Sequence, residues 1–168
     1  MISSTSDSAL VRLQRAVAAM LRTDPMFSTR PVITEDVQDI EGELDKALST
    51  LDSSKGTIGT AAVVMTALGQ VGSPNTPGPV LDPVGVHVWI FENVVVNRDT
   101  SGGGVSALEL AERAMRHLHL RKVPLEGCGA LIARGMRIEE PPESLKSCLA
   151  FHVEFRTKIG LAPITTGR

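Results

Sequence analysis

Apolar side chains recur three or four positions apart in residues 8–24, which predicts one face of an amphipathic helix. They are Leu10, Leu13, Val17, Met20 and Leu21. Pro25 ends this helix, because the residue before a proline disfavours helical backbone angles. After a short extended piece around Val32 and Ile33, the same spacing returns over residues 37–51 and predicts a second helix. Its apolar positions are Val37, Ile40, Leu44, Leu48 and Leu51.

From residue 57 the pattern changes to that of strands. Residues 57–68 are β-branched and apolar, and residues 84–96 alternate between two apolar sets, which predicts a central strand or one covered by helices. The first set is Val84, Val86, Val88 and Ile90, and the second is His87, Trp89 and Phe91. Two further strands are expected at residues 129–139 and 147–158. In the last of them we expect Phe151, Val153 and Phe155 to point inward and His152, Glu154 and Arg156 outward.

The segments between these strands differ in kind. Residues 69–85 hold four of the ten prolines and predict a long hairpin tip, within which Pro74, Asn75, Pro77 and Pro79 are candidate partner contacts. Loops of this length in a compact domain are usually functional or disordered. Ser106 and Glu109 form a Ser-x-x-Glu capping box, which starts a third helix that should end near Leu120. Its inward positions are Leu108, Ala111, Met115 and Leu118.

The element order is therefore ααββαββ. It predicts a single α+β domain over residues 8–160, with a four-stranded, mainly antiparallel sheet of two hairpins and three helices packed on it. Residues 1–7 and 161–168 are expected to be flexible tails.

The composition of the chain argues against some classes of function. The formal charge of −2 and the aromatic content of 3 % argue against a general nucleic-acid-binding protein. The start of the chain has no signal-peptide pattern and no apolar run approaches a membrane span, so we expect a soluble protein made in a reducing cytoplasm. Cys128 and Cys148 are expected to be buried free thiols, although their places on separate strands leave a disulfide geometrically possible.

Candidate chemistry is weak throughout the chain. His117 and His119 lie two apart on a helix and point in different directions, while His87 and His152 could be neighbours across the sheet without further ligands beside them. There is no Gly-x-Ser-x-Gly elbow, and the glycines at 102–104 are not followed by Gly-Lys-Ser/Thr. We therefore expect no catalytic residue, no cofactor and no metal, and a protein that is not an enzyme.

Charges are distributed unevenly. The second helix is acidic, with Asp39 and Glu43 among its carboxylates, whereas the third carries Arg113 and Arg116. These are either solvated faces or surfaces that meet between identical subunits, and head-to-tail contacts of that kind can close into rings. An acidic face inside a ring would repel DNA phosphates, so that a duplex passes without specific binding.

A polar pair, Glu92 and Asn93, interrupts the most apolar strand, and Asn97 and Arg98 follow at its end. One interpretation is a locally satisfied bulge. The other is a polar junction that orders the glycine turn and lies at or beside a subunit interface, where Arg98 pairs with a carboxylate.

The stretch FENVVVNRDTSGGGVSALELAERAMRHLH, the closing RGMRIEEPPESLKSCLAFHVEFRTKIG and the element order resemble the tail terminator, or tail completion, proteins of long-tailed bacteriophages. The resemblance covers most of residues 8–160, and the acidic second helix departs from it. It implies a virion protein, assembled in the host bacterial cytoplasm, that forms a homo-hexameric ring on the finished tail tube. Such a ring stops tube polymerisation and contacts the tail tube protein and the head-tail connector.

Two alternatives remain open. Within phage assembly, the chain could be another neck, connector or baseplate component. From a different class, it could be a small ligand-binding domain or enzyme with a pocket near Trp89, His87 and His152.

Overall fold

A computed structural model describes residues 8–34, 39–49, 59–67, 69, 71, 79–98 and 104–161, with only the backbone of Arg98. The helices are α1 (Ala9–Arg22), α2 (Pro25–Ser28), α3 (Ile40–Ser49), α4 (Val94–Arg98) and α5 (Ala107–Leu118), with a 3-10 turn at Glu143–Leu145. The strands are β1 (Val32–Thr34), β2 (Thr60–Ala67), β3 (Val80–Asn93), β4 (Ile132–Glu139) and β5 (Cys148–Gly160). The predicted N-terminal tail lies outside the described residues, and so does the predicted C-terminal tail apart from Leu161. The same holds for Pro74, Asn75 and Pro77 of the hairpin tip.

The strands form one sheet in the order β1-β2-β3-β5-β4. All neighbours are antiparallel except β1 and β2, which run parallel. The α+β class and the two hairpins agree with the prediction, but the sheet has five strands rather than four, and the short helices α2 and α4 come in addition to the three predicted helices. The extra strand is β1, the short extended piece after α2, whose Ile33 pairs with Val63. Three residues are too few for an alternating pattern to identify a strand.

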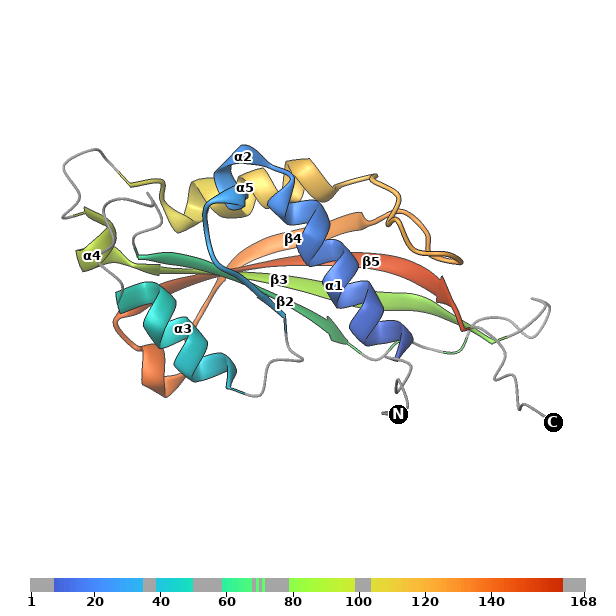
Figure 1. Cartoon of the computed structure of the whole chain (residues 1–168), viewed down its shortest axis with the longest axis horizontal. Coiled ribbons are helices and arrows are strands. Elements are labelled where there is room, and N and C mark those ends of the chain that lie inside the picture. The colour runs from blue at the N-terminus through green and yellow to red at the C-terminus, as the bar shows by residue number, and fades with distance from the viewer. Residues whose placement is uncertain are drawn as a thin grey trace, which may run out of the picture.

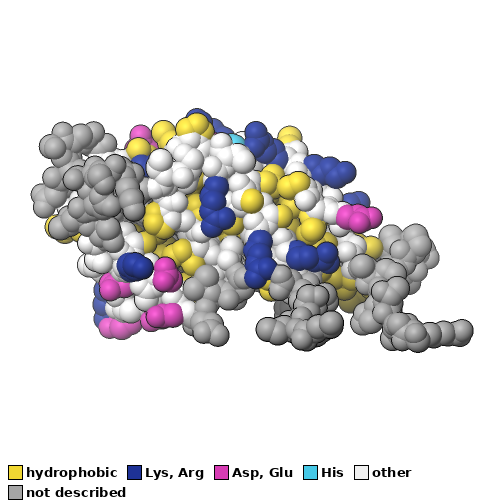
Figure 2. Space-filling model, viewed as in Figure 1, with side chains coloured by type: hydrophobic (Ala, Val, Ile, Leu, Met, Phe, Trp, Pro, Cys, Tyr) yellow, Lys and Arg dark blue, Asp and Glu magenta, His cyan; other side chains and the backbone are white. Residues whose placement is uncertain are grey.

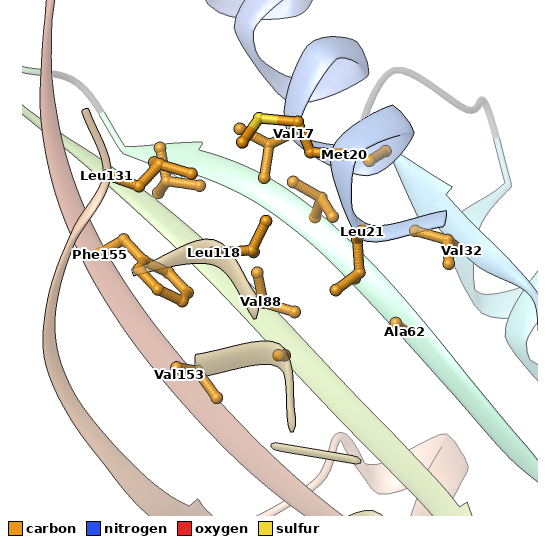
Figure 3. Packing of buried hydrophobic residues seen from close by; sticks show 14 of the residues in the cluster. Val17, Met20, Leu21, Val32, Ala62, Val88, Leu118, Leu131, Val153 and Phe155 are labelled. Atoms are coloured by element: carbon orange, nitrogen blue, oxygen red, sulfur yellow. The ribbon is translucent and has the colours of Figure 1, made fainter. Parts of the chain in front are cut away.

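Helices cover the two faces of the sheet to different extents (Figure 1). Helices α1 and α5 pack on one face, which we call the packed face, and α3 packs on part of the other, which we call the open face. In Figure 3, Val17 and Leu21 of α1 and Leu118 of α5 meet Val88 and Phe155 of the sheet. The main hydrophobic core therefore lies between the sheet and the α1–α5 layer.

Local sequence explains where the helices begin. Ser8 caps α1 by accepting a hydrogen bond from the Val11 amide at 3.2 Å, and Asp24 caps α2 by accepting one from the Met26 amide at 2.9 Å. The predicted capping box of α5 is present: Ser106 Oγ accepts from the Glu109 amide, and Glu109 accepts from the Ser106 amide. These side chains satisfy backbone donors that have no partner inside the helix.

Several predicted boundaries were wrong. β3 begins at Val80, so residues 80–85 belong to a strand rather than to the hairpin tip. It ends at Asn93, because residues 94–96 are helical and belong to α4. Helix α5 ends at Leu118, close to its predicted end near Leu120, which follows with a positive φ of 61°. Leu108, predicted to point inward, is 44 % exposed.

Candidate functional site

A buried polar junction joins the end of β3 to α4 and α5. Glu92 and Asn97 are each 4 % exposed. The Asn97 side-chain amide donates to Glu92 Oε1 at 2.7 Å and to the Val105 carbonyl at 3.1 Å. The Ala107 backbone amide donates to Glu92 Oε2 at 2.7 Å. Both carboxylate oxygens of Glu92 are therefore hydrogen-bonded within the chain.

The position of Glu92 suits a negative charge. Ala107 is the first residue of α5, where unpaired backbone amides and the helix dipole favour an anion. A carboxylate in the strand thus fixes the start of a helix that lies 15 residues later in the chain. The sequence pattern marked Glu92 as unusual, but it did not show that its partner would be a helix N-terminus.

Asn93 and two glycines complete the junction. The Val96 amide donates to Asn93 Oδ1 at 3.3 Å, and the Asn93 amide donates to the Gly59 carbonyl at 2.8 Å. Gly59 has a φ of +73°, and a Cβ there would lie 2.9 Å from the Asn97 amide nitrogen. A Cβ at Gly104 would clash with the Asn97 side chain. Glu92, Asn93 and Asn97 are therefore brought together as predicted, while the side chain of Arg98 lies outside the described residues.

A second buried carboxylate, Asp24, holds α1, α2 and α5 together. It is 1 % exposed, and its Oδ2 lies 2.6 Å from Arg113 Nε and 3.4 Å from His117 Nδ1. Burial alone would raise the pKa of Asp24, but the Met26 amide and the Arg113 guanidinium outweigh that effect and lower it. The predicted interface residue Arg113 thus has a partner within its own chain. Asp24 gave no signal beyond its place before a proline.

The other charged candidates lie on the surface. Arg116 forms an exposed pair with Glu112 one turn away on α5, with 3.3 Å between nitrogen and oxygen. Glu43 on the N-terminal half of α3 is exposed, and so is Asp39, which immediately precedes the helix. Asp39 Oδ1 accepts a hydrogen bond from the Gly42 amide at 2.8 Å. In Figure 2 acidic side chains gather at the lower left, where α3 lies, and basic side chains lie over the centre and right. The acidic surface predicted on α3 is therefore present, whereas Arg113 and Arg116 of α5 are both paired with carboxylates of their own chain.

Three rings stack on the open face. The centroids of His152 and Trp89 lie 4.6 Å apart, and those of His152 and His87 lie 4.8 Å apart. His87 Nδ1 is 2.6 Å from His152 Nε2, which confirms that the two histidines are neighbours. The prediction that His152 points outward was wrong in one respect, because the stack leaves it only 2 % exposed.

The surroundings of His152 oppose its protonation. Burial, then His87 and Arg137, lower the pKa of His152, against smaller opposite effects of Glu139 and Glu154. His152 Nδ1 is buried without a hydrogen-bond partner, 3.8 Å from Glu139 Oε1. Within the described residues no group of three or more His, Cys, Asp or Glu side chains has the arrangement of a metal site.

An apolar groove lies beside this stack, at the place where the sequence allowed a pocket. Its volume is about 430 Å³, and it runs between α3 and Trp89. The lining residues are mostly apolar: Ile40, Leu44, Val63, Met65, Trp89, Phe91, Pro142 and Leu145, with Glu41 and Glu140 at its polar positions. Of the described part of the chain, Trp89 is the residue that belongs to both the stack and the groove.

The two cysteines are free and buried, as expected. Burial raises the pKa of both thiols. Cys148 begins β5, whereas Cys128 bridges to Ile159 near its end. Eleven residues of strand separate these points, a distance of about 36 Å. A disulfide between them within one chain is therefore excluded.

Sequence reasoning missed a hollow at the far end of β5, which we call the cationic groove. It measures about 400 Å³ and is lined on two neighbouring strands by Arg134, Arg156 and Lys158, with Asp82 at the start of β3. The pairing of β5 is irregular on both sides there, between Leu81 and Val84 and between Ala133 and Gly135. Such bulges break the alternation on which the sequence prediction depended.

None of the helices described is long and apolar enough to cross a membrane. Pro79, the one loop candidate among the described residues, is exposed, and its carbonyl accepts from the Leu161 amide at 2.8 Å.

The comparisons with known proteins give information about the fold of the chain. No protein-family model and no curated protein matches the sequence. Among solved structures, the chain is similar to a chain of the virion of a native gene transfer agent particle, with a TM-score of 0.54 and 13 % identity. The match covers 92 % of this chain and 100 % of that one. At this identity the likeness shows a shared fold.

Proposed function

We propose that this chain is a structural subunit of a phage-like particle, and more specifically a tail terminator that forms a ring on the finished tail tube. The observation that carries the proposal is the fold likeness to a virion chain over 92 % of this chain and the whole of the other. The resemblance of residues 91–119 and 134–160 to tail terminator proteins supports the finer role. The stoichiometry of six and the contacts with tail tube and connector proteins belong to the same proposal.

The geometry is compatible with a role in assembly. The buried carboxylates Glu92 and Asp24 are both engaged in holding elements together. Among the described residues, the groups available for contact with other molecules include surface charges, exposed apolar side chains and the groove beside Trp89. The exposed apolar side chains include Val95 on α4, Leu108 on α5, Ile138 on β4 and Leu149 on β5.

The test measures assembly directly. The purified chain is examined by light scattering over a concentration series and by negative-stain electron microscopy, alone and with purified tail tubes. We expect rings of about six subunits, or caps at one end of the tubes. Loss of the gene from the phage or prophage that carries it should give tails of uncontrolled length.

Other results would point to other roles. Tails of normal length without heads would favour a neck connector, and a defect confined to the distal end would favour a baseplate component. A monomer that ignores tail tubes would contradict the assembly proposal.

The groove beside Trp89 favours a second candidate, the binding of a small apolar ligand. Because Trp89 lines the groove, its fluorescence should respond to an apolar probe such as anilinonaphthalene sulfonate at low micromolar concentration. Leu44→Lys would place a charge in the groove and should abolish the response. A response that survives in this variant would exclude the groove as the binding site.

A further inference from the structure

The cationic groove carries an excess of positive charge that nothing described on this chain neutralises. Of its residues, Arg156 has a carboxylate nearby, with 3.6 Å from its Nε to Glu154 Oε1. Arg134 and Lys158 form no ion pair with any described residue. Asp82 is the one carboxylate in the lining, against three cationic side chains. With Glu154 counted beside Asp82, the groove presents a net charge of about one positive unit to solvent.

The groove is shaped by irregular pairing on both strands that flank the end of β5. In β4 the register shift places Arg134 as the extra residue between Ala133 and Gly135. In β3, Asp82 and Pro83 fall between the paired residues Leu81 and Val84. Bulges kink strands and redirect side chains, and they are frequent beside functional sites. Here they open a hollow above Arg156, Thr157 and Lys158.

The complementary charge lies on one flank of α3. Glu41 and Asp45 are four residues apart, so they share a flank of the helix, and both are exposed. Neither forms an ion pair with another described residue. Residues Asp39 and Glu43 share the opposite flank, where Lys46 lies three residues after Glu43 and Asp39 caps the helix.

The two charged sites cannot meet within one chain. Helix α3 packs near Cys148 at the start of β5, in the cluster that also contains Leu44 and Leu145. The groove includes Lys158, ten residues later along the same strand, which corresponds to about 33 Å. Opposite charges at opposite ends of one subunit complement each other between two copies placed head to tail, and such a contact repeats from copy to copy.

The spacing of the charges also matches. Residues four apart on a helix have Cβ atoms about 6 Å apart, as for Glu41 and Asp45. Residues two apart on one face of a strand lie about 6.6 Å apart, as for Arg156 and Lys158. One turn of α3 can therefore present two carboxylates to two cations of the groove. Arg134 lies on the neighbouring strand.

We propose that the cationic groove of one copy receives the Glu41–Asp45 flank of α3 of the next copy, and that this contact orients subunits head to tail. The inference rests on the proposed function in taking a second copy as the partner. A nucleic acid is the less suitable occupant, because the described lining of the groove holds three cations and the whole chain has a formal net charge of −2, whereas nucleic-acid-binding domains carry a clear basic excess.

The experiment reverses the charges on each side of the proposed contact in turn. The groove variant is R134E/R156E/K158E, and the helix variant is E41K/D45K. We expect each alone to need at least about 100-fold higher concentration to assemble, measured by light scattering. Glu43→Lys on the other flank of α3 and Arg12→Glu on α1 are single-charge controls and should assemble like the unchanged chain. Circular dichroism and thermal unfolding establish that each variant is folded.

Mixing the two variants gives the sharper result. A groove variant has a negative groove and a negative helix, and a helix variant has a positive groove and a positive helix. Alternating copies therefore restore complementarity at every contact, so an equimolar mixture should assemble where neither component does. A mixture that stays dissociated while both variants are folded would overturn the proposal.

Two further outcomes separate the causes of failure. If the unchanged chain forms rings and the charge-reversed variants form them equally well, the interface is wrong and the proposed function stands. If the unchanged chain neither associates nor caps tail tubes, the proposed interface and the proposed function fail together.

Fluorescence anisotropy with a short DNA duplex at about 50 mM salt tests whether a nucleic acid occupies the groove instead. Binding of DNA that the groove variant loses, with no change in assembled mass, would assign the groove to nucleic acid and overturn the proposal.

Discussion

The packed face and the open face of the same sheet are constructed differently. Under α1 and α5, most side chains of β3 and β5 are aliphatic or phenylalanine and buried, as for Val88, Val153 and Phe155. On the open face, α3 covers one end, and the remaining side chains include stacked rings and charges. The packed face supplies most of the hydrophobic stabilisation. The open face is where side chains remain accessible for contacts with other molecules.

The largest difference between the faces should come from truncating one aromatic ring on each. Phe155 is 0 % exposed, so Phe155→Ala should lower the free energy of unfolding by about 4 kcal/mol, through lost burial and the cavity left behind. Trp89 on the open face is half-buried and lines a groove that is already present, so Trp89→Ala should cost less than half as much. Urea unfolding of the two variants measures the difference. Equal losses would contradict the division into a packed and an open face.

A smaller loss is expected from the polar junction at the edge of the packed core. Glu92→Gln preserves shape but removes the charge, and its amide group must face either Asn97 Nδ2 or the Ala107 amide, which are both donors. An unsatisfied buried hydrogen-bonding group costs about 1–3 kcal/mol. Glu126→Gln, at an exposed position, is the matched control and should leave urea unfolding unchanged. A Glu92→Gln chain as stable as the control would mean that the junction relaxes without cost.

Asp24 should contribute a stabilisation that depends on pH. Its pKa is lowered in the folded chain, so its contribution is present above the unfolded pKa, near 3.9, and is lost as pH falls through the folded pKa. Asn also caps helices, so Asp24→Asn isolates the loss of charge beside Arg113 and His117. The variant should be less stable at pH 7, and the difference should shrink as the pH falls below about 3.9. A difference that is constant with pH would contradict a charge effect.

The sequence was sufficient to predict the parts of this structure that local rules determine. The alternation of β3 from Val84 to Phe91, the capping box of α5 and the apolar stripe of α1 were all visible as patterns, and the structure confirms them. Period and capping depend on neighbours within one or two turns. The elements that carry the packed core could therefore be found from the chain alone.

The parts that failed depend on contacts between distant residues. Strand β1 exists because Val32–Thr34 lies beside β2, and α4 replaces a strand end where the Glu92 junction redirects the chain. Arg134 lines the cationic groove because the pairing of β4 with β5 shifts by one residue at that point. Side-chain alternation predicts which face of the sheet a residue lies on only while the strand register is regular. At a bulge, the alternation therefore assigns the redirected residues to the wrong face.

The smallest effect expected is optical and belongs to the open face. Trp89 stacks on His152 at 4.6 Å, and a protonated imidazole quenches a neighbouring indole, so Trp89 fluorescence should fall as His152 is protonated. Burial, His87 and Arg137 lower the pKa of His152, and the midpoint should therefore lie below 6.5, the ordinary value. Stability linked to His152 is present above pH 6.5 and is lost as pH falls toward the folded pKa, because the unfolded chain takes up the proton first.

His152→Phe keeps a stacked ring and should remove the fluorescence transition, whereas His119→Gln on the other side of the sheet should leave it in place. A midpoint at or above 6.5 would mean that Glu139, 3.8 Å from His152, outweighs burial, and that the open face stabilises a charge there.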